Sequence, residues 1–219
     1  MEEIKNLSDI VDNGLCIGCG LCQSIAGENL ISINMTEKGR LEPKELKPLS
    51  NTIFNKIKNT CPGVVVEGLP EKEIIKNSNK DIIWGEYHSI FYDWSTNSKI
   101  RYQRSTGGLL NGLSLYLIES KKVKFICHTS SVPDKPMRNY SKFSYTKDDL
   151  LNCDSRSRYG PSSPLDKFHK ALSLNEPFAF VGKPCDVSAI RQLSKIDDRV
   201  DKVCKYLLTI ECGGFAEVT

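Results

Sequence analysis

The chain has 219 residues, enough for one large domain or two small ones. Its 30 Lys and Arg residues stand against 27 Asp and Glu, and this balance of +3 gives no reason to expect nucleic acid as a partner. No apolar run approaches the roughly 20 residues of a membrane-spanning helix, and no apolar secretion segment opens the chain, so we expect a cytoplasmic protein.

The first element along the chain is a loop of closely spaced cysteines. Cys16, Cys19 and Cys22 are each separated by two residues, and Cys61, followed by Pro62, lies thirty-nine residues after Cys22. Three thiolates in one loop and a distant fourth before a proline are typical of a 4Fe–4S site. The two glycines between these cysteines let backbone N–H groups approach the inorganic sulfides. The spacing therefore predicts one-electron chemistry.

Two other uses of the cysteines are less consistent with this pattern. Zinc sites usually carry two separated Cys-x-x-Cys pairs, whereas here three cysteines share one loop. A disulfide framework fits poorly with nine cysteines, an odd number. The usual bacterial ferredoxin run would place its fourth cysteine where Ala26 stands, so Cys61 must complete the set. We therefore expect a single cluster.

Short elements follow the cysteine loop. Alternating apolar and polar residues predict a strand over 29–35 and a return strand over 41–43. Residues 49–58 have helical spacing and lead to Cys61, and residues 67–81 have the composition of a linker. We therefore predict a small ferredoxin-like iron–sulfur domain over residues 1–75.

Residues 76–219 alternate between strand and helix patterns. Strands are expected over residues 90–92, 123–127, 178–181 and 206–210. Helices are expected over residues 106–117, 167–174 and 187–193. This alternation predicts an α/β domain with a mostly parallel or mixed sheet, and an α+β arrangement for the chain as a whole.

Three segments of this second domain are candidates for binding a nucleotide cofactor. Residues 104–108 open a helix whose first N–H groups could face a phosphate, or they form an ordinary helix start. Residues 156–164 carry two arginines and a tyrosine in a proline-rich loop, or are a plain surface loop. Residues 182–186 follow a buried strand, where Lys183 could meet a phosphate or a flavin. Cys185 is a cluster ligand, a redox thiol or a packed small side chain.

Six segments, taken in order, resemble the coenzyme F-420 hydrogenase/dehydrogenase beta-subunit family. They are residues 16–22, 61–63, 104–108, 157–161, 181–186 and 211–214. The resemblance implies an oxidoreductase subunit with an N-terminal 4Fe–4S module and an FAD-binding α/β domain over residues 76–219. In such subunits FAD exchanges a hydride with the deazaflavin coenzyme F-420 and single electrons with the cluster.

The resemblance also implies roles for individual residues. The cluster ligands would be Cys16, Cys19, Cys22 and Cys61. The flavin pocket would be lined by Ser105, Thr106, Gly107, Gly108, Ser157, Arg158, Tyr159, Lys183, Pro184 and Cys185. No separate catalytic residue is expected, because the chemistry belongs to the flavin. The implied partner is a redox subunit or a ferredoxin, and a homo-oligomer stays open.

The length of the chain departs from the family pattern. Relatives usually continue well beyond the segment that matches residues 211–214, whereas this chain stops at Thr219. We therefore expect the flavin-binding domain to be incomplete at its C-terminal end. Two alternatives stay open: a non-catalytic 4Fe–4S electron-transfer or docking subunit without flavin, and a zinc-stabilised interaction module.

Overall fold

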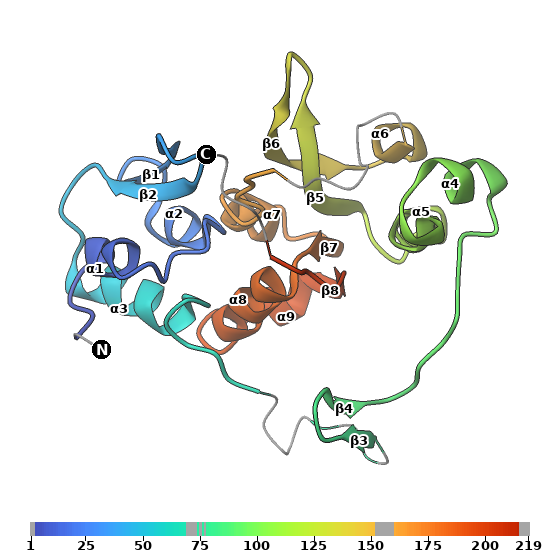
Figure 1. Cartoon of the computed structure of the whole chain (residues 1–219), viewed down its shortest axis with the longest axis horizontal. Helices are drawn as coiled ribbons and strands as arrows, with labels where there is room; N and C mark the ends of the chain where they lie inside the picture. Colours follow the sequence, from blue (N-terminus) through green and yellow to red (C-terminus); the bar gives the residue numbers. More distant parts are fainter. Residues whose placement is uncertain (1–2, 69–73, 75, 77, 152–159, 215–219) are drawn as a thin grey trace.

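The computed structural model describes residues 3–68, 74, 76, 78–151 and 160–214 of the chain. The N-terminal part, residues 3–68, contains short helices and a two-stranded antiparallel sheet (Figure 1). Its elements are α1 (Leu7–Asp12), α2 (Leu21–Ala26), β1 (Ile31–Met35), β2 (Leu41–Glu45) and α3 (Asn51–Thr60). The predicted pair of strands and the predicted helix before Cys61 are confirmed.

Local capping explains where these helices begin. Asn6 accepts a hydrogen bond from the backbone N–H of Asp9, whose carboxylate in turn accepts one from the N–H of Asn6, and this capping box starts α1. The hydroxyl of Ser50 accepts from the N–H of Ile53 at the start of α3. Helices α1 and α2 were not predicted, because six residues are too few to show a helical period.

The remainder of the described chain is built around a four-stranded sheet with the order β6-β5-β7-β8. Strands β5, β7 and β8 are parallel, and β6 pairs antiparallel with β5. The elements are β3 (Asn79–Asp81), β4 (Gly85–Tyr87), α4 (Ser98–Gln103), η2 (Thr106–Gly108), α5 (Leu109–Glu119), β5 (Phe125–Val132), β6 (Lys135–Ser144), α6 (Lys147–Leu151), α7 (Phe168–Ser173), β7 (Phe178–Gly182), α8 (Pro184–Ser194), α9 (Arg199–Val203) and β8 (Cys204–Thr209). The predicted α/β arrangement with a mixed sheet is confirmed.

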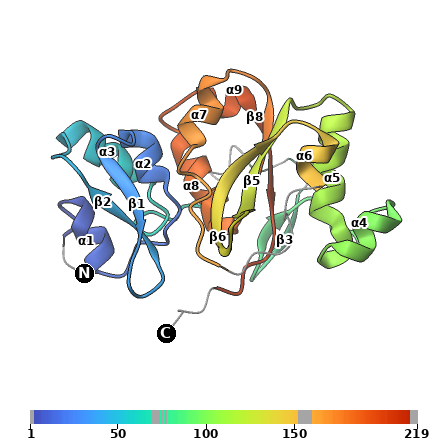
Figure 2. The same ribbon diagram turned by 90° about the horizontal axis from the view of Figure 1, so that it is seen from above.

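Alternation along the central strands gives the sheet two apolar faces. Phe125, Phe178 and Phe180 point to one face, where the rings of Phe125 and Phe178 stack with centroids 5.0 Å apart. Ile126 follows Phe125 on β5, and Ala179 lies between Phe178 and Phe180 on β7. Both point to the other face and pack against α5. Figure 2 shows α7, α8 and α9 on the first face and α5 and α6 on the second. Burial on both faces explains why residues 125–127 and 178–181 are apolar without interruption.

Two predictions about the strands need correction. The strand expected at residues 90–92 is wrong, because these residues pair with no strand among the described residues and their side chains are exposed. Strand β6 was missed: its ten residues are mostly polar, as an edge strand with one solvated face allows. Apolar content alone therefore misplaces strands whose pairing depends on the rest of the fold.

The N-terminal part packs on α7 and α8, the helices that cover one face of the sheet (Figure 2). The backbone N–H of Leu165 donates to the carbonyl of Cys19 over 2.9 Å. The hydroxyl of Ser24 accepts from the backbone N–H of His169 over 2.7 Å. Lys170 and Glu28 form an exposed ion pair at 2.6 Å. The cysteine loop is thus attached to the second part of the chain, and the division at residues 75 and 76 stays a prediction.

Among the described residues no helix is both long enough and apolar enough to span a bilayer.

A buried histidine makes the stability of the fold sensitive to acid. Burial lowers the pKa of His128 to about 4, and its ring contacts the Ser144 hydroxyl at 2.8 Å. The neutral ring therefore stabilises the fold fully above its unfolded pKa near 6.5, and this contribution is lost as the pH falls through 4. We expect the free energy of unfolding to drop by up to about 3 kcal/mol across that window, at about 1.36 kcal/mol per pKa unit.

Denaturant unfolding at several pH values measures this slope. In His128→Gln the slope between pH 6.5 and 4 should flatten, whatever the variant costs in stability at neutral pH. His88→Gln, on an exposed histidine, is the matched control and should retain the wild-type slope. A slope that is identical in all three proteins would show that His128 does not titrate in this window.

Candidate metal centre

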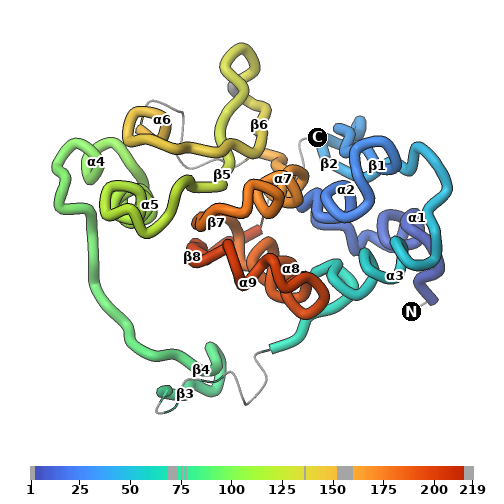
Figure 3. Tube along the Cα trace, turned by 180° about the vertical axis from the view of Figure 1, so that it is seen from behind, coloured from blue at the N-terminus to red at the C-terminus, as the bar shows by residue number. Residues whose placement is uncertain are grey.

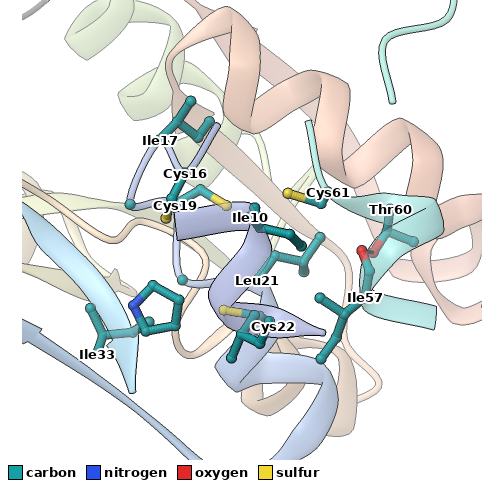
Figure 4. Close-up of a pocket in the computed structure, with 14 residues that line it drawn as sticks. Ile10, Cys16, Ile17, Cys19, Leu21, Cys22, Ile33, Ile57, Thr60 and Cys61 are labelled. Atoms are coloured by element: carbon teal, nitrogen blue, oxygen red, sulfur yellow. Dashed lines mark hydrogen bonds between the residues drawn. The ribbon is translucent and has the colours of Figure 1, made fainter. Parts of the chain in front are cut away.

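The four cysteines singled out by their spacing line one pocket of the structure. Figure 4 shows their sulfur atoms around the pocket, on the side chains of Cys16, Cys19, Cys22 and Cys61. The other lining side chains are mostly apolar, among them Ile10, Leu21, Ile33 and Ile57. The pocket has an empty volume of about 430 Å³, including its open mouth. The structure therefore brings the predicted ligand set together in a largely apolar setting.

Three separate elements deliver the cysteines to this pocket. Cys16 and Cys19 lie on the loop between α1 and α2, Cys22 lies in the first turn of α2, and Cys61 caps the end of α3. Ile57 accepts the N–H of Cys61 over 2.8 Å, which fixes the distant cysteine to the helix. Helix α3, predicted from its spacing, is thus the element that brings the fourth thiol to the loop.

The loop is held tightly on both sides, and this explains its glycines. Gly18 has a φ of +71°, and a Cβ there would lie 2.6 Å from the carbonyl oxygen of Leu41. Gly20 has a φ of +83°, and a Cβ there would lie 2.9 Å from backbone and side-chain atoms of Asp166. Both conformations strain any residue with a side chain. The cysteine loop therefore passes between β2 and the segment that precedes α7.

Backbone N–H groups point at all four sulfurs, and at three of them in one repeated pattern. The N–H of Gly18 bonds to Cys16, that of Leu21 to Cys19, and that of Gly63 to Cys61, in each case from two residues further along. Such hydrogen bonds favour the thiolate form of the sulfur. They are also one of the ways in which a protein sets the reduction potential of an iron–sulfur cluster.

Burial has the opposite effect on these thiols. Desolvation raises the pKa of Cys16, Cys19 and Cys61 above the ordinary value, and raises the pKa of Cys22 to about 12. Without a bound metal, all four side chains are therefore neutral thiols near pH 7. A metal binds thiolates, so its binding must release protons from this pocket.

The raised pKa values predict that the metal-free chain loses stability in alkali. A thiol whose folded pKa exceeds its unfolded value stabilises the fold fully below the unfolded value, near 8.5, and less as the pH rises toward the folded value. For Cys22 this window extends to about pH 12. We therefore expect the free energy of unfolding of the metal-free chain to fall steadily above pH 8.5.

Unfolding under reducing, metal-free conditions between pH 7.5 and 10.5 measures this loss. Cys22→Ala should reduce the alkaline slope, because its buried thiol is removed. Cys212→Ala, at an exposed cysteine, is the control and should leave the slope unchanged. Equal slopes in both variants would show that the pocket thiols are not the titrating groups.

The four cysteines could in principle hold a single ion or a cluster. Among the described residues, no three His, Cys, Asp or Glu side chains converge as they would around one metal ion. Zinc draws its four ligands to roughly 2.0–2.3 Å from one centre. A cubane instead takes one thiolate at each of four separate irons. The choice of a cluster over a single zinc ion therefore rests on the cysteine spacing and stays a prediction.

The predicted flavin residue Lys183 is already paired within the chain. Its ammonium lies 2.9 Å from the carboxylate of Asp186, which is fully buried and also accepts the backbone N–H of Lys183 at the start of α8. Burial opposes a charged lysine, but the carboxylate of Asp186 outweighs this and raises the pKa of Lys183. Asp186 lies in the candidate segment 182–186 but was given no role there, although a proline with an acidic residue two positions later signals such a helix start.

The glycines at the start of α5 are required by packing. A Cβ on Gly107 would lie 2.9 Å from the side chain of Trp94, and one on Gly108 would lie 2.7 Å from Ile100. Thr106 shares their left-handed backbone, with a φ of 52°. Ser157, Arg158 and Tyr159 lie outside the described residues. That these segments and residues 183–185 line one flavin pocket stays a prediction.

Comparison with known proteins finds a family match within the second part of the chain. Residues 90–169 match the family model described as "Coenzyme F420 hydrogenase/dehydrogenase, beta subunit N-term". Over 188 residues the chain is 27% identical to the coenzyme F420-dependent sulfite reductase of Methanocaldococcus jannaschii, an alignment that covers 85% of this chain and 26% of that protein. The chain thus spans about a quarter of the length of this relative, which is by its name an F420-dependent oxidoreductase.

A solved structure with related features comes from the F420-reducing NiFe hydrogenase complex of Methanosarcina barkeri. It covers 52% of this chain and 41% of its own, with 22% identity and a TM-score of 0.46. The resemblance predicted from the motifs is confirmed over residues 90–169, which match the model of the coenzyme F-420 hydrogenase/dehydrogenase beta-subunit family. The four pocket cysteines lie outside that segment.

Proposed function

We propose that the chain is an iron–sulfur flavoprotein oxidoreductase subunit. It would bind one 4Fe–4S cluster and FAD and pass electrons between a hydride carrier, coenzyme F-420 or a similar compound, and a redox partner. One observation carries the proposal: four thiols, each with a backbone N–H directed at its sulfur, line an apolar pocket attached to the family segment. Four thiolates are the donor set that a cubane requires.

The chain's own residues have three tasks at this pocket. The four cysteines hold the group once their protons have left. The apolar lining, with Ile10, Leu21 and Ile57 buried, limits the access of water. The cysteine loop holds the sulfurs in place, because it packs closely against its neighbours at Gly18 and Gly20. When bound, FAD supplies exchange between two-electron hydride transfer and single electrons, which the cluster carries one at a time.

Cys19 links the pocket to the predicted flavin site. Its side chain belongs to the same buried cluster as Ala189 and Ile190 of α8. The charged pair at the start of that helix, Lys183 and Asp186, is close enough to Cys19 to interact with it electrostatically. Residues 183–185 are those expected to meet the flavin. The route that we propose for the electrons therefore runs between Cys19 and the start of α8.

Anaerobic reconstitution tests this proposal. The chain is supplied with iron, sulfide and FAD, and is then separated from free cofactors. We expect flavin bands above the broad iron–sulfur absorption, and bleaching of both by a reduced deazaflavin. A chain that keeps its cluster but retains no flavin at any FAD concentration would overturn the flavoprotein proposal.

The alternative, a 4Fe–4S electron carrier or docking subunit without flavin, has its own support. The ammonium of Lys183 is neutralised by Asp186, and the glycines at 107 and 108 serve the packing of Trp94 and Ile100. Neither feature requires a nucleotide. This alternative predicts a cluster that is reduced and reoxidised by one-electron reagents with no turnover of a hydride donor. Steady turnover with reduced deazaflavin or a nicotinamide would exclude it.

We also infer a reducing compartment and a redox partner. The described cysteines are all free thiols, including the exposed Cys212, which suits the cytoplasm. A partner subunit or a ferredoxin would accept the single electrons. Both inferences rest on the proposed function rather than on a contact in the structure.

A further inference from the structure

Residues 78–94 form an arm that carries an unusual concentration of exposed apolar side chains. Figures 1 and 3 show the arm running apart from the rest of the molecule before it returns at α4. The exposed fractions are 99% for Ile82, 79% for Ile83, 77% for Trp84, 78% for Ile90, 81% for Phe91 and 101% for Tyr92. Folded monomers rarely expose such large side chains side by side, so this arm has the character of a contact surface.

The arm is weakly held within its own chain. Its hairpin consists of β3 and β4, three residues each, which pair with one another. An isolated hairpin of this size is at best marginally stable in water. The segment that follows, residues 88–93, belongs to no strand or helix. A second surface that paired with this extended backbone would therefore add hydrogen bonds as well as cover its side chains.

The same chain offers such a surface at the edge of its sheet. Strand β8 is the last strand in the order β6-β5-β7-β8, so one of its sides faces no other strand among the described residues. An exposed sheet edge presents backbone donors and acceptors that readily pair with another extended segment. Ile210, the residue that follows the end of β8, is 46% exposed and adds an apolar side chain to this edge.

We propose that the arm of one copy lies along β8 of a second copy, and that two copies exchange arms in a two-fold dimer. Because each chain carries both an arm and a strand, β8, with an unpaired side among the described residues, the exchange is reciprocal and closes after two copies. A buried aromatic side chain contributes about 150–250 Å². Trp84, Phe91 and Tyr92, with the three isoleucines, therefore reach the order of the roughly 800 Å² per partner of a stable interface.

The oligomeric state of the intact chain tests the proposal. Sedimentation equilibrium between about 1 and 100 µM should show a monomer–dimer system without larger species. The double variant Phe91→Ser, Tyr92→Ser should weaken the dimer at least about 100-fold, because aromatic anchors dominate such contacts. Both side chains are exposed in the single copy, so the variant should fold. Tyr102→Ser, at a 91% exposed tyrosine on α4, is the matched control and should dimerise normally.

Hydrogen exchange then locates the contact. Amides of β8 should exchange more slowly in the wild-type dimer than in the double variant, and amides of β6, the opposite edge, should not change. A chain that is monomeric at every concentration would overturn the proposal. So would a dimer that is unaffected by the double variant, an open-ended series of larger species, or a dimer without protection at β8.

Discussion

Cys19→Ala should abolish cluster binding by the otherwise intact chain. Cys19 is the most deeply buried of the four pocket thiols, and its N–H···S bond from Leu21 and its carbonyl bond to Leu165 fix its position. Without Cys19, one iron of the cluster would lack a thiolate ligand. The residues that line the pocket include no fifth cysteine that could replace it. We expect cluster affinity to fall at least about 100-fold, seen as the loss of iron and acid-labile sulfide after anaerobic gel filtration.

The matched control is Cys212→Ala. This cysteine is exposed and does not line the pocket, so the variant should retain its full iron and sulfide content. Circular dichroism of both variants verifies that Cys19→Ala is folded, as expected for a small side chain replacing a small side chain. Full cluster content in Cys19→Ala would show that the ligand set is wrong.

Gly63→Ala should damage both the fold and the pocket. A Cβ at this position would lie 1.9 Å from the carbonyl oxygen of Leu15 and 2.8 Å from its carbonyl carbon, both of them backbone atoms that cannot rotate away. Gly63 donates its N–H to the sulfur of Cys61, and Leu15 directly precedes Cys16. Relief of the clash therefore separates the two ends of the cluster site.

We expect the free energy of unfolding of Gly63→Ala to fall by about 3 kcal/mol or more, at the upper end for overpacking, with reduced cluster retention. Gly68→Ala is the control, since a Cβ there meets no atom of the described residues within 4 Å, and its stability should stay within about 0.5 kcal/mol of wild type. Denaturant unfolding and iron analysis measure both effects. Equal stability of the two variants would show that the contact between residues 15 and 63 is not as close as described.

The cysteine spacing was the most informative part of the sequence. It identified the four side chains that line the pocket, because ligands that hold one group must be spaced so that a loop and a helix can deliver them together. The apolar segments of β5 and β7, residues 125–127 and 178–181, were also predictable, since burial on both faces leaves a simple signal. The family resemblance, resting on motifs distributed along the chain, was confirmed over residues 90–169.

Features that depend on distant contacts could not be predicted in this way. The hydrogen bond between Ser24 and His169 joins residues 145 positions apart, and neither residue belongs to a recognisable motif. The pairing of Lys183 with buried Asp186 changes the expected role of that lysine, although only the helix start was visible in the sequence. The apolar residues 90–92 look like a buried strand but are exposed on the arm. The hydrophobicity of a segment predicts that its side chains are favoured in a buried setting, but it does not identify the surface that buries them.

The iron, acid-labile sulfide, zinc and flavin contents of the anaerobically purified, intact chain test the central claim most directly. The account predicts about four irons and four sulfides per chain, one bound FAD, and no stoichiometric zinc. Stoichiometric zinc without sulfide in the pocket of Cys16, Cys19, Cys22 and Cys61 would contradict it.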